Sequence, residues 1–104
     1  MMEIFNLKTI HVYPYEQRGK NVFSQTDEFK VQMIALPAGG KMPECDMASD
    51  VIFYVMDGEA TVRVNQEEAP LIAGQCLITE PATMSMQSEQ GVRILGIQIS
   101  TGKE

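Results

Sequence analysis

Short segments in which apolar and polar residues alternate, separated by turn residues, run through most of this sequence. Such alternation places every second side chain on the same face of a β-strand, whereas the spacing typical of an amphipathic helix is almost absent. The clearest segments are residues 29–36, 51–56, 59–64 and 92–100, with Asp57-Gly58 between the second and the third. An Asp-Gly pair between two such runs is typical of a two-residue hairpin turn, because glycine tolerates positive φ. The pattern predicts an all-β sandwich or barrel built from many short strands.

The length of the chain, 104 residues, is typical of one domain with a modest core. We expect a single barrel domain over residues 1–104, with an N-terminal strand and a polar loop in residues 1–28 and the barrel proper in residues 29–100. Within the loop, Tyr13 and Tyr15 are candidates for a dimer contact, for the mouth of the barrel, or for simple packing on the surface. Strands at both edges of such a sheet expose unpaired backbone groups, which pairing with a second copy would cover. A homodimer is therefore the expected assembly.

The charge pattern argues against two classes of partner. The net charge is −6, and the 8 basic residues are scattered rather than clustered. Nucleic acids and anionic membrane surfaces both require grouped Lys and Arg, so neither is expected as a partner. No apolar run approaches the roughly 20 residues that span a bilayer, and residues 1–5 lack the features of a signal peptide. The expected location is the cytoplasm, where Cys45 and Cys76 would be free thiols.

Two segments of the sequence resemble the conserved motifs of small single-domain cupins, the RmlC-like barrel family. Residues 39–58 open with two glycines, carry a proline two residues before the first ligand position, and end in an apolar strand pattern. Residues 74–85 match the second motif in their glycine, whereas Pro81 lies one residue later than in that motif. The resemblance covers residues 29–100 and implies an all-β fold, the double-stranded β-helix or jelly-roll barrel, usually as a homodimer.

The resemblance also implies a metal centre, and this sequence lacks its ligands. Cupins of this kind hold a divalent metal with two His and one Glu from the first motif and one His from the second. The matching positions here are Cys45, Met47, Val51 and Ser85. Fe, Mn, Ni and Zn need imidazole or carboxylate donors, which none of these side chains supplies. We therefore expect no metal of the usual kind, and no dioxygenase or isomerase activity that depends on one.

A shift of the first motif by one residue would exchange the side chains that face inward. Glu44 and Asp46 would then take the first two ligand positions and offer two carboxylates to a hard cation. The spacing of the glycine and the proline favours Cys45 over Glu44. Glu44, Asp46 and Asp50 are accordingly expected on a solvated rim near the barrel mouth.

We expect the barrel interior to be apolar and rich in sulfur, and to bind a small molecule without a metal. Methionine adapts to irregular cavities and to varied ligands, and apolar pockets with a few polar groups are common ligand sites. The protein would then act in binding rather than in catalysis. The candidate ligand-binding residues are Cys45, Met47, Val51, Phe53, Ser85 and Met33.

Two alternatives give Cys45 a chemical role. In one, Cys45 is the nucleophile or redox thiol of an enzyme, which would need a base or a cation nearby to lower its pKa. In the other, thiolate and thioether sulfur atoms bind Cu(I), a soft metal ion. The residues that would supply this sulfur are Cys45 and Met47, together with Met42, Met84 or Met86.

Overall fold

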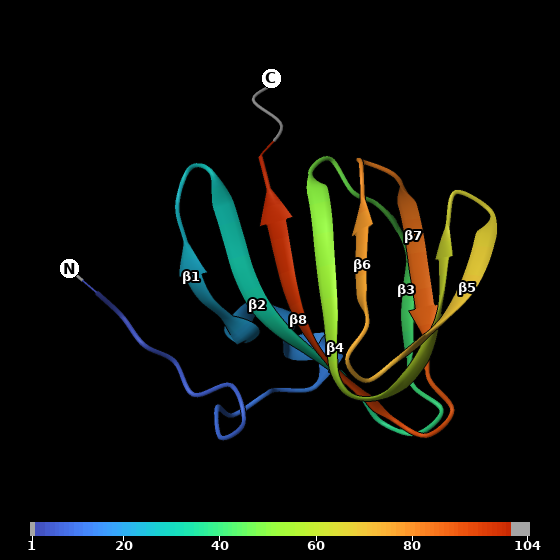
Figure 1. The fold of residues 1–104 in the computed structure, drawn as a ribbon, viewed down its shortest axis with the longest axis horizontal. Coiled ribbons are helices and arrows are strands. Elements are labelled where there is room, and N and C mark those ends of the chain that lie inside the picture. Colours follow the sequence, from blue (N-terminus) through green and yellow to red (C-terminus); the bar gives the residue numbers. More distant parts are fainter. Residues whose placement is uncertain (1, 101–104) are drawn as a thin grey trace.

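A computed structural model describes residues 2–100, which form one short 3-10 helix and eight strands (Figure 1). No helix in this part of the chain is long and apolar enough to cross a membrane. The elements in chain order are η1 (Tyr15–Asn21), β1 (Val22–Gln25), β2 (Phe29–Leu36), β3 (Lys41–Asp46), β4 (Asp50–Val64), β5 (Glu67–Ile72), β6 (Cys76–Thr79), β7 (Thr83–Gln87) and β8 (Val92–Ile99).

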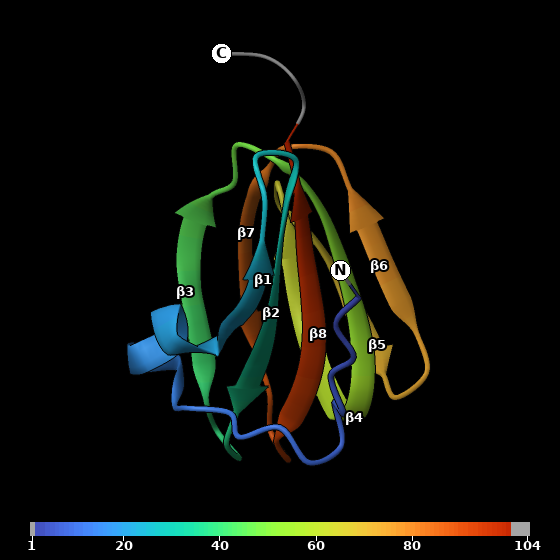
Figure 2. The same ribbon diagram turned by 90° about the vertical axis from the view of Figure 1, so that its left-hand side faces the viewer.

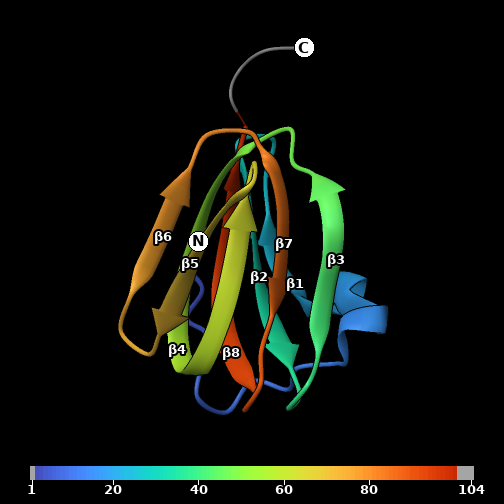
Figure 3. The ribbon, with the colours of Figure 1, turned by 90° about the vertical axis from the view of Figure 1, so that its right-hand side faces the viewer.

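The strands form one curled antiparallel sheet in the order β1-β2-β8-β4-β7-β3, with β5 and β6 each paired to β4. The curl brings two walls face to face, and these are seen from opposite sides in Figures 2 and 3. One wall contains β1, β2, β8, β6 and the first part of β4, and the other contains β3, β7, β5 and the second part of β4. The predicted jelly-roll fold is confirmed. Strands β1 and β3 end the sheet, and η1 packs against β2 and β1 at the side of this open seam.

Strand β4 runs without interruption through Asp57-Gly58, so the predicted hairpin turn at this pair is wrong. The first part of β4 pairs with β6 and β8, and the second part pairs with β5 and β7. The pairing with β8 is irregular between Val55 and Asp57, and Gly58 has a φ of +88°. Glycine therefore takes the positive φ that the prediction assigned to it, but it bends a strand from one wall to the other instead of reversing the chain.

The N-terminal region also differs from the prediction. The described part of the predicted N-terminal strand, residues 2–12, forms turns and irregular chain. Arg93 of β8 ties this segment to the barrel, because its guanidinium donates to the carbonyl oxygens of Leu7 and Ile10, each at 2.9 Å. The predicted loop of residues 13–28 contains η1 and β1, and β1 extends the sheet by pairing with β2. The sheet thus begins one strand earlier than the sequence indicates.

The core lies between the two walls and is filled by alternate residues of the facing strands. Val51, Phe53 and Val55 of β4 are each at most 1% exposed. From the other wall, β7 contributes Met84 and Met86 to the same cluster of buried side chains. Methionine sulfur is therefore present in the interior, as the sequence predicts.

Candidate functional site

A cavity of about 500 Å³, here called the interior pocket, opens at the seam between η1, β2 and β3. Its walls combine sulfur-containing, aromatic, amide and charged side chains from six elements of the fold. The lining residues are Tyr15, Glu16, Arg18, Gly19, Val22, Lys30, Gln32, Ile34, Met42, Cys45, Met47, Phe53 and Gln98.

Strand β3 and the residue that follows it supply the sulfur atoms of the interior pocket. The Cys45 thiol donates to the Met47 thioether, with 3.6 Å between Sγ and Sδ. The β3–β7 pairing shifts register between Met42 and Cys45, which lets both residues face inward although they are three apart. Phe53 of β4 lines the same pocket. Cys45, Met47 and Phe53, three of the predicted ligand-binding residues, thus lie around one cavity.

The pocket also has a polar side, which the alternation of residues along β2 does not predict. Lys30 and Gln32 alternate along β2, and Gln98 of β8 is the register partner of Lys30. Gln32 is 9% exposed, and its side-chain amide makes no hydrogen bond within residues 2–100. One feature of the sequence does indicate it. Lys30 and Gln32 are spaced two residues apart in series with Ile34 and Leu36, so all four side chains lie on one face of the strand, and Ile34 and Leu36 lie in the core.

Helix η1 covers the mouth of the interior pocket. Tyr15 packs against the core, and Arg18 lies 4.4 Å from the centre of its ring and donates to its carbonyl oxygen at 3.2 Å. Burial raises the pKa of the Tyr15 phenol, Arg18 opposes this effect, and Cys45 adds a smaller upward contribution. Of the three roles considered for Tyr15, the structure places it at the barrel mouth, where it lines the same cavity as Cys45.

Two predicted members of the site, Val51 and Met33, do not line this pocket. Val51 faces inward as predicted, but it is fully buried in the packed core. The prediction that Met33 contributes to the pocket is wrong, because Ile34 and Leu36 occupy the inward positions of β2. Met33 therefore lies on the opposite face of the strand, where it is buried apart from the core cluster.

The predicted inward orientation of Ser85 is also wrong. The buried Met84 and Met86 take the inward positions of β7, so Ser85 faces outward beside Arg63, its partner in the β4–β7 pairing. Counting the second motif from Pro81 instead of from its glycine moves the ligand position by one residue, to Met86. A displacement of one residue reverses the face of a strand, which explains the error.

The alternative alignment, with two carboxylates facing inward, is wrong as well. Glu44 and Asp46 are both exposed and do not line the interior pocket, and Asp46 Oδ1 accepts a hydrogen bond of 2.6 Å from the Thr83 hydroxyl. Within residues 2–100, no three His, Cys, Asp or Glu side chains are grouped so that they could hold a metal ion. The inward side chains at the four family ligand positions are a thiol, two thioethers and a valine, which do not fit a centre built from imidazole and carboxylate.

The alternative in which Cys45 acts as a catalytic thiol finds no histidine in the pocket. His11 packs edge-to-face on Tyr13, with 4.5 Å between the ring centres, and does not line the cavity. The polar groups that share the pocket with Cys45 are the Tyr15 phenol, two cations, two amides and the Glu16 carboxylate. Catalysis by this thiol remains a prediction.

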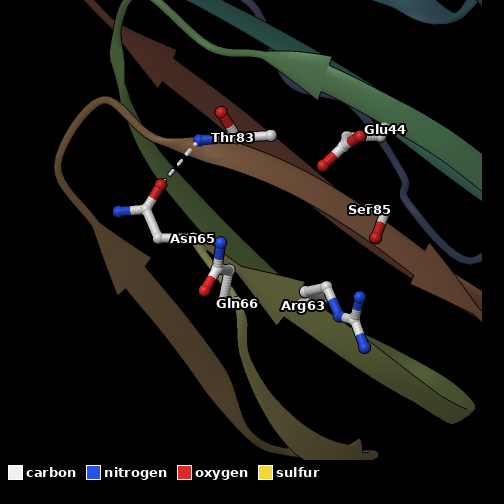
Figure 4. Close-up of a pocket in the computed structure, with 6 residues that line it drawn as sticks. All are labelled: Glu44, Arg63, Asn65, Gln66, Thr83 and Ser85. Carbon is white, nitrogen blue, oxygen red and sulfur yellow. Dashed lines mark hydrogen bonds between the residues drawn. The ribbon is translucent and has the colours of Figure 1, made fainter.

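A second hollow, the outer groove, lies on the outside of the wall formed by β3, β7 and β4 (Figure 4). Arg63 in this groove is paired with the exposed Glu68 at 2.7 Å, and Asn65 Oδ1 accepts from the Thr83 backbone N–H at 3.0 Å. These groups already have partners and lie close to solvent, which favours the interior pocket as the functional site. The groove has a volume of about 720 Å³ and is lined by Glu44, Arg63, Asn65, Gln66, Thr83 and Ser85.

The sequence matches no protein-family model and no curated protein sequence. A cupin superfamily protein of Desulfitobacterium hafniense is similar in structure, with a TM-score of 0.72 and 15% identity over 76% of this chain and 73% of that protein. The Thermus thermophilus protein TT1209 gives a TM-score of 0.82 and 27% identity over 95% of this chain and 98% of its own. Salicylate 1,2-dioxygenase of Pseudoaminobacter salicylatoxidans gives a TM-score of 0.66 and 19% identity over 69% of this chain, but over only 20% of the enzyme. The fold is that of a small cupin domain, which confirms the predicted resemblance.

Proposed function

We propose that this cupin barrel binds a small organic molecule in the interior pocket, without a metal ion of the kind held by His and carboxylate ligands. The pocket itself carries the proposal: about 500 Å³ of space bounded by Phe53, by the sulfur atoms of Cys45 and Met47, and by polar side chains that include Gln32. Concave sites with apolar walls and a few placed polar groups are typical of small-molecule binding. The proposed role is binding rather than metal-dependent catalysis, because the ligand set of such a centre is absent from the residues that face inward.

Alkylation of Cys45 provides a test of binding. In a Cys76→Ser variant, Cys45 is the one remaining thiol, and its reaction with N-ethylmaleimide reports access to the pocket. We expect 8-anilinonaphthalene-1-sulfonate, an apolar anionic dye, to fluoresce on binding and to slow this reaction. The matched control is Cys45→Ser, in which the exposed Cys76 on β6 should react at the same rate with and without the dye. Dye that protects neither thiol, or both equally, would contradict binding in the interior pocket.

A second candidate function is the binding of a soft metal ion such as Cu(I). The observation that favours it is the 3.6 Å separation of Cys45 Sγ and Met47 Sδ. Two sulfur ligands that each lie about 2.3 Å from one tetrahedral ion are about 3.8 Å apart, so little movement would be needed. Met42 lines the same cavity and offers a third sulfur atom. Thiolate and thioether ligands select Cu(I) over harder ions.

Competition for Cu(I) between the protein and the chelator bicinchoninate, under anaerobic conditions, tests whether the pocket binds this ion. Wild-type protein should withdraw one equivalent of Cu(I) from the chelator, and Met47→Leu should withdraw much less. Met33→Leu is the matched control, because Met33 is a buried methionine on the other face of its strand. Equal competition by the two variants would show that Cu(I) does not use the pocket.

The assembly that we propose is a homodimer formed through the outer face of β4 and β6. Ile78 is 70% exposed and Tyr54 is 41% exposed on this face, where they pair with Ile52 and Cys76. Strand β6 has one strand neighbour within the described residues, β4, so its other edge is open to a partner. Light scattering after size-exclusion chromatography should give a dimer for the wild type and a monomer for Ile78→Asp. A monomeric wild type at micromolar concentration would contradict the proposal.

A cytoplasmic location is proposed on the basis of the cysteines. Cys45 on β3 and Cys76 on β6 are free thiols in the structure, as is usual for proteins of a reducing compartment. Neither nucleic acid nor a membrane is proposed as a partner, because the basic residues are scattered over the sequence. Cell fractionation tests the location, and recovery of the native protein outside the cytoplasmic fraction would contradict it.

A further inference from the structure

We infer that the small molecule held in the interior pocket is a carboxylic acid whose carboxylate is bound by Lys30, Gln32 and Gln98. The inference rests on the proposed function and adds the chemical class of the ligand and the residues that recognise it. The neighbouring strands β2 and β8 carry these three side chains, and all three line the cavity.

Gln32 provides the first observation. Its side chain is 9% exposed, and the amide has no hydrogen-bond partner among residues 2–100. Buried amides normally pair within the protein, since an unpaired N–H or C=O group away from water is costly. No polar side-chain atom in this part of the chain is sealed from solvent without a partner, so the Gln32 amide must open into the cavity. Its N–H groups are therefore free to donate to a ligand.

Lys30 places a positive charge beside this amide. The one salt bridge within residues 2–100 joins Arg63 to Glu68, which leaves the Lys30 ammonium without a carboxylate partner. Gln98 is the register partner of Lys30 across the β2–β8 pairing, so the two side chains leave the same face of the sheet side by side. An ammonium flanked by amide N–H donors is suited to an acceptor with two oxygen atoms and one negative charge.

The other charges that line the pocket support a ligand with a single negative charge. Arg18 and Glu16 of η1 lie at the mouth and offset each other, and Lys30 is the remaining cation. The pocket therefore carries one net positive charge in a chain whose net charge is −6. A carboxylate matches this charge, whereas a phosphate would bring up to two negative charges to one ammonium.

The rest of the pocket defines the body of the ligand. Met42, Met47 and Phe53 offer thioether and aromatic surface to any atoms that extend beyond the carboxylate. Flexible methionine side chains accept apolar groups of varied shape. The ligand is accordingly an amphipathic monocarboxylic acid, with its charged end against β2 and β8 and its apolar end against β3 and β4.

Amide chemical-shift titrations of the ¹⁵N-labelled protein test this inference with two probes of nearly equal shape, hexanoate and hexanamide. Hexanoate should bind about tenfold more tightly than hexanamide. A hydrogen bond to a charged group contributes more free energy than a neutral one, and the difference corresponds to about a tenfold change in affinity. Shifts should appear at Lys30, Gln32 and Gln98. In Lys30→Met and in Gln98→Glu, each of which removes the net positive charge of the pocket, the preference for hexanoate should vanish. The matched control, Lys41→Met, removes an exposed cation that does not line the pocket and should keep the preference.

The two probes separate failure of this inference from failure of the proposed function. Equal affinity for both probes in the wild type, or an unchanged preference in Lys30→Met, would overturn the carboxylate inference while leaving binding in the pocket intact. Absence of shifts with either probe, together with absence of dye binding, would overturn the proposed function itself and this inference with it.

Discussion

Glu59 at the end of the bend in β4 holds the loop between β7 and β8 through a single carboxylate oxygen. Its Oε2 accepts from the backbone N–H groups of Gln90 and Glu89, at 2.7 and 2.9 Å, and from the Ser88 hydroxyl at 3.1 Å. These bonds, led by the one from Gln90, lower the pKa of Glu59, and desolvation opposes them. Hydrogen bonds that favour the charged form of a carboxyl always act in this direction.

The lowered pKa predicts how stability depends on pH. The folded protein binds the Glu59 proton less readily than the unfolded chain, so this contribution is present above the unfolded pKa of about 4.3 and is lost as pH falls through the folded pKa. Glu59→Gln removes the contribution throughout. Urea unfolding measured from pH 7 to pH 3 should show that the unfolding free energy of the wild type exceeds that of Glu59→Gln at pH 7 and that this difference shrinks as the pH falls. Glu67→Gln, at an exposed position on β5, is the control and should follow the wild type. Parallel curves for wild type and Glu59→Gln would contradict this role.

Gly96 of β8 has no side chain and so leaves room for the Phe53 ring beside the interior pocket. A Cβ atom at position 96 would lie 3.2 Å from Phe53 Cε1 and 3.4 Å from Ile34 Cδ1, which is tight for buried carbon atoms. Gly96→Ala should destabilise the fold by about 1–3 kcal/mol, the usual cost of overpacking a core. Gly19→Ala is the control, because a Cβ there meets no atom within 4 Å. Chemical denaturation measures both, and equal stability of the two variants would contradict the tight fit.

The polar side of the pocket shows where sequence patterns lose information at this scale. Gln32 and Gln98 are polar residues on alternating strands, and such residues usually face solvent. The apolar series that includes Met33 therefore predicts the wrong face of β2 as the inner one. Both faces of β2 hold buried residues, so alternation alone does not distinguish them. The first cupin motif, by contrast, correctly predicts that Cys45 and Met47 face the interior, because this sequence has the same spacing as the motif from the glycine to these two positions.

At the scale of single elements, the bend in β4 connects the two walls of the barrel, and Gly58 makes it possible. A side chain there would require an unfavourable positive φ and would also collide with the backbone of Gly91 and Val92. Gly58→Ala should cost about 2–5 kcal/mol of unfolding free energy, the sum of conformational strain and collision. The matched control, Gly39→Ala, has a φ of +80° but meets no atom within 4 Å. It should cost only about 1–2 kcal/mol. Similar losses in both variants would mean that strain alone determines the cost.

The same bend explains why element boundaries are harder to predict than the fold. An Asp-Gly pair between two apolar runs is compatible with a hairpin turn that reverses the chain and with a bend inside one strand. The sequence does not distinguish the two, because glycine takes a positive φ in both. The runs themselves are predicted correctly as strand, including residues 29–36 and 92–99. Strand β3 was not predicted, since its Pro43 and the preceding glycines resemble a loop. Proline is tolerated there because β3 is an edge strand that pairs only with β7 among the described strands.

At the scale of the whole molecule, two segments outside the regular strands pack against the sheet. Helix η1 lies at the seam between the ends of the sheet, and the N-terminal segment crosses the outside of the wall that contains β8 (Figure 2). Phe5 in this segment packs on Phe23 of β1, with 4.7 Å between the ring centres. These long-range contacts join residues that are far apart in sequence, and no local pattern of residues predicts them.

Arg93 provides the test of this arrangement, because one guanidinium nitrogen donates to the carbonyl oxygens of Leu7 and Ile10 across more than 80 residues of sequence. Arg93→Met keeps much of the apolar stem but removes both bonds, and it should lower the unfolding free energy by about 1–3 kcal/mol. Cleavage by chymotrypsin within residues 2–12 should become faster, because the segment loses its attachment. Arg63→Met is the matched control: its partner is the exposed Glu68, so its loss should cost no more than about 1 kcal/mol and leave the cleavage rate unchanged. If the two variants are cleaved at the same rate, Arg93 does not hold the N-terminal segment on the barrel.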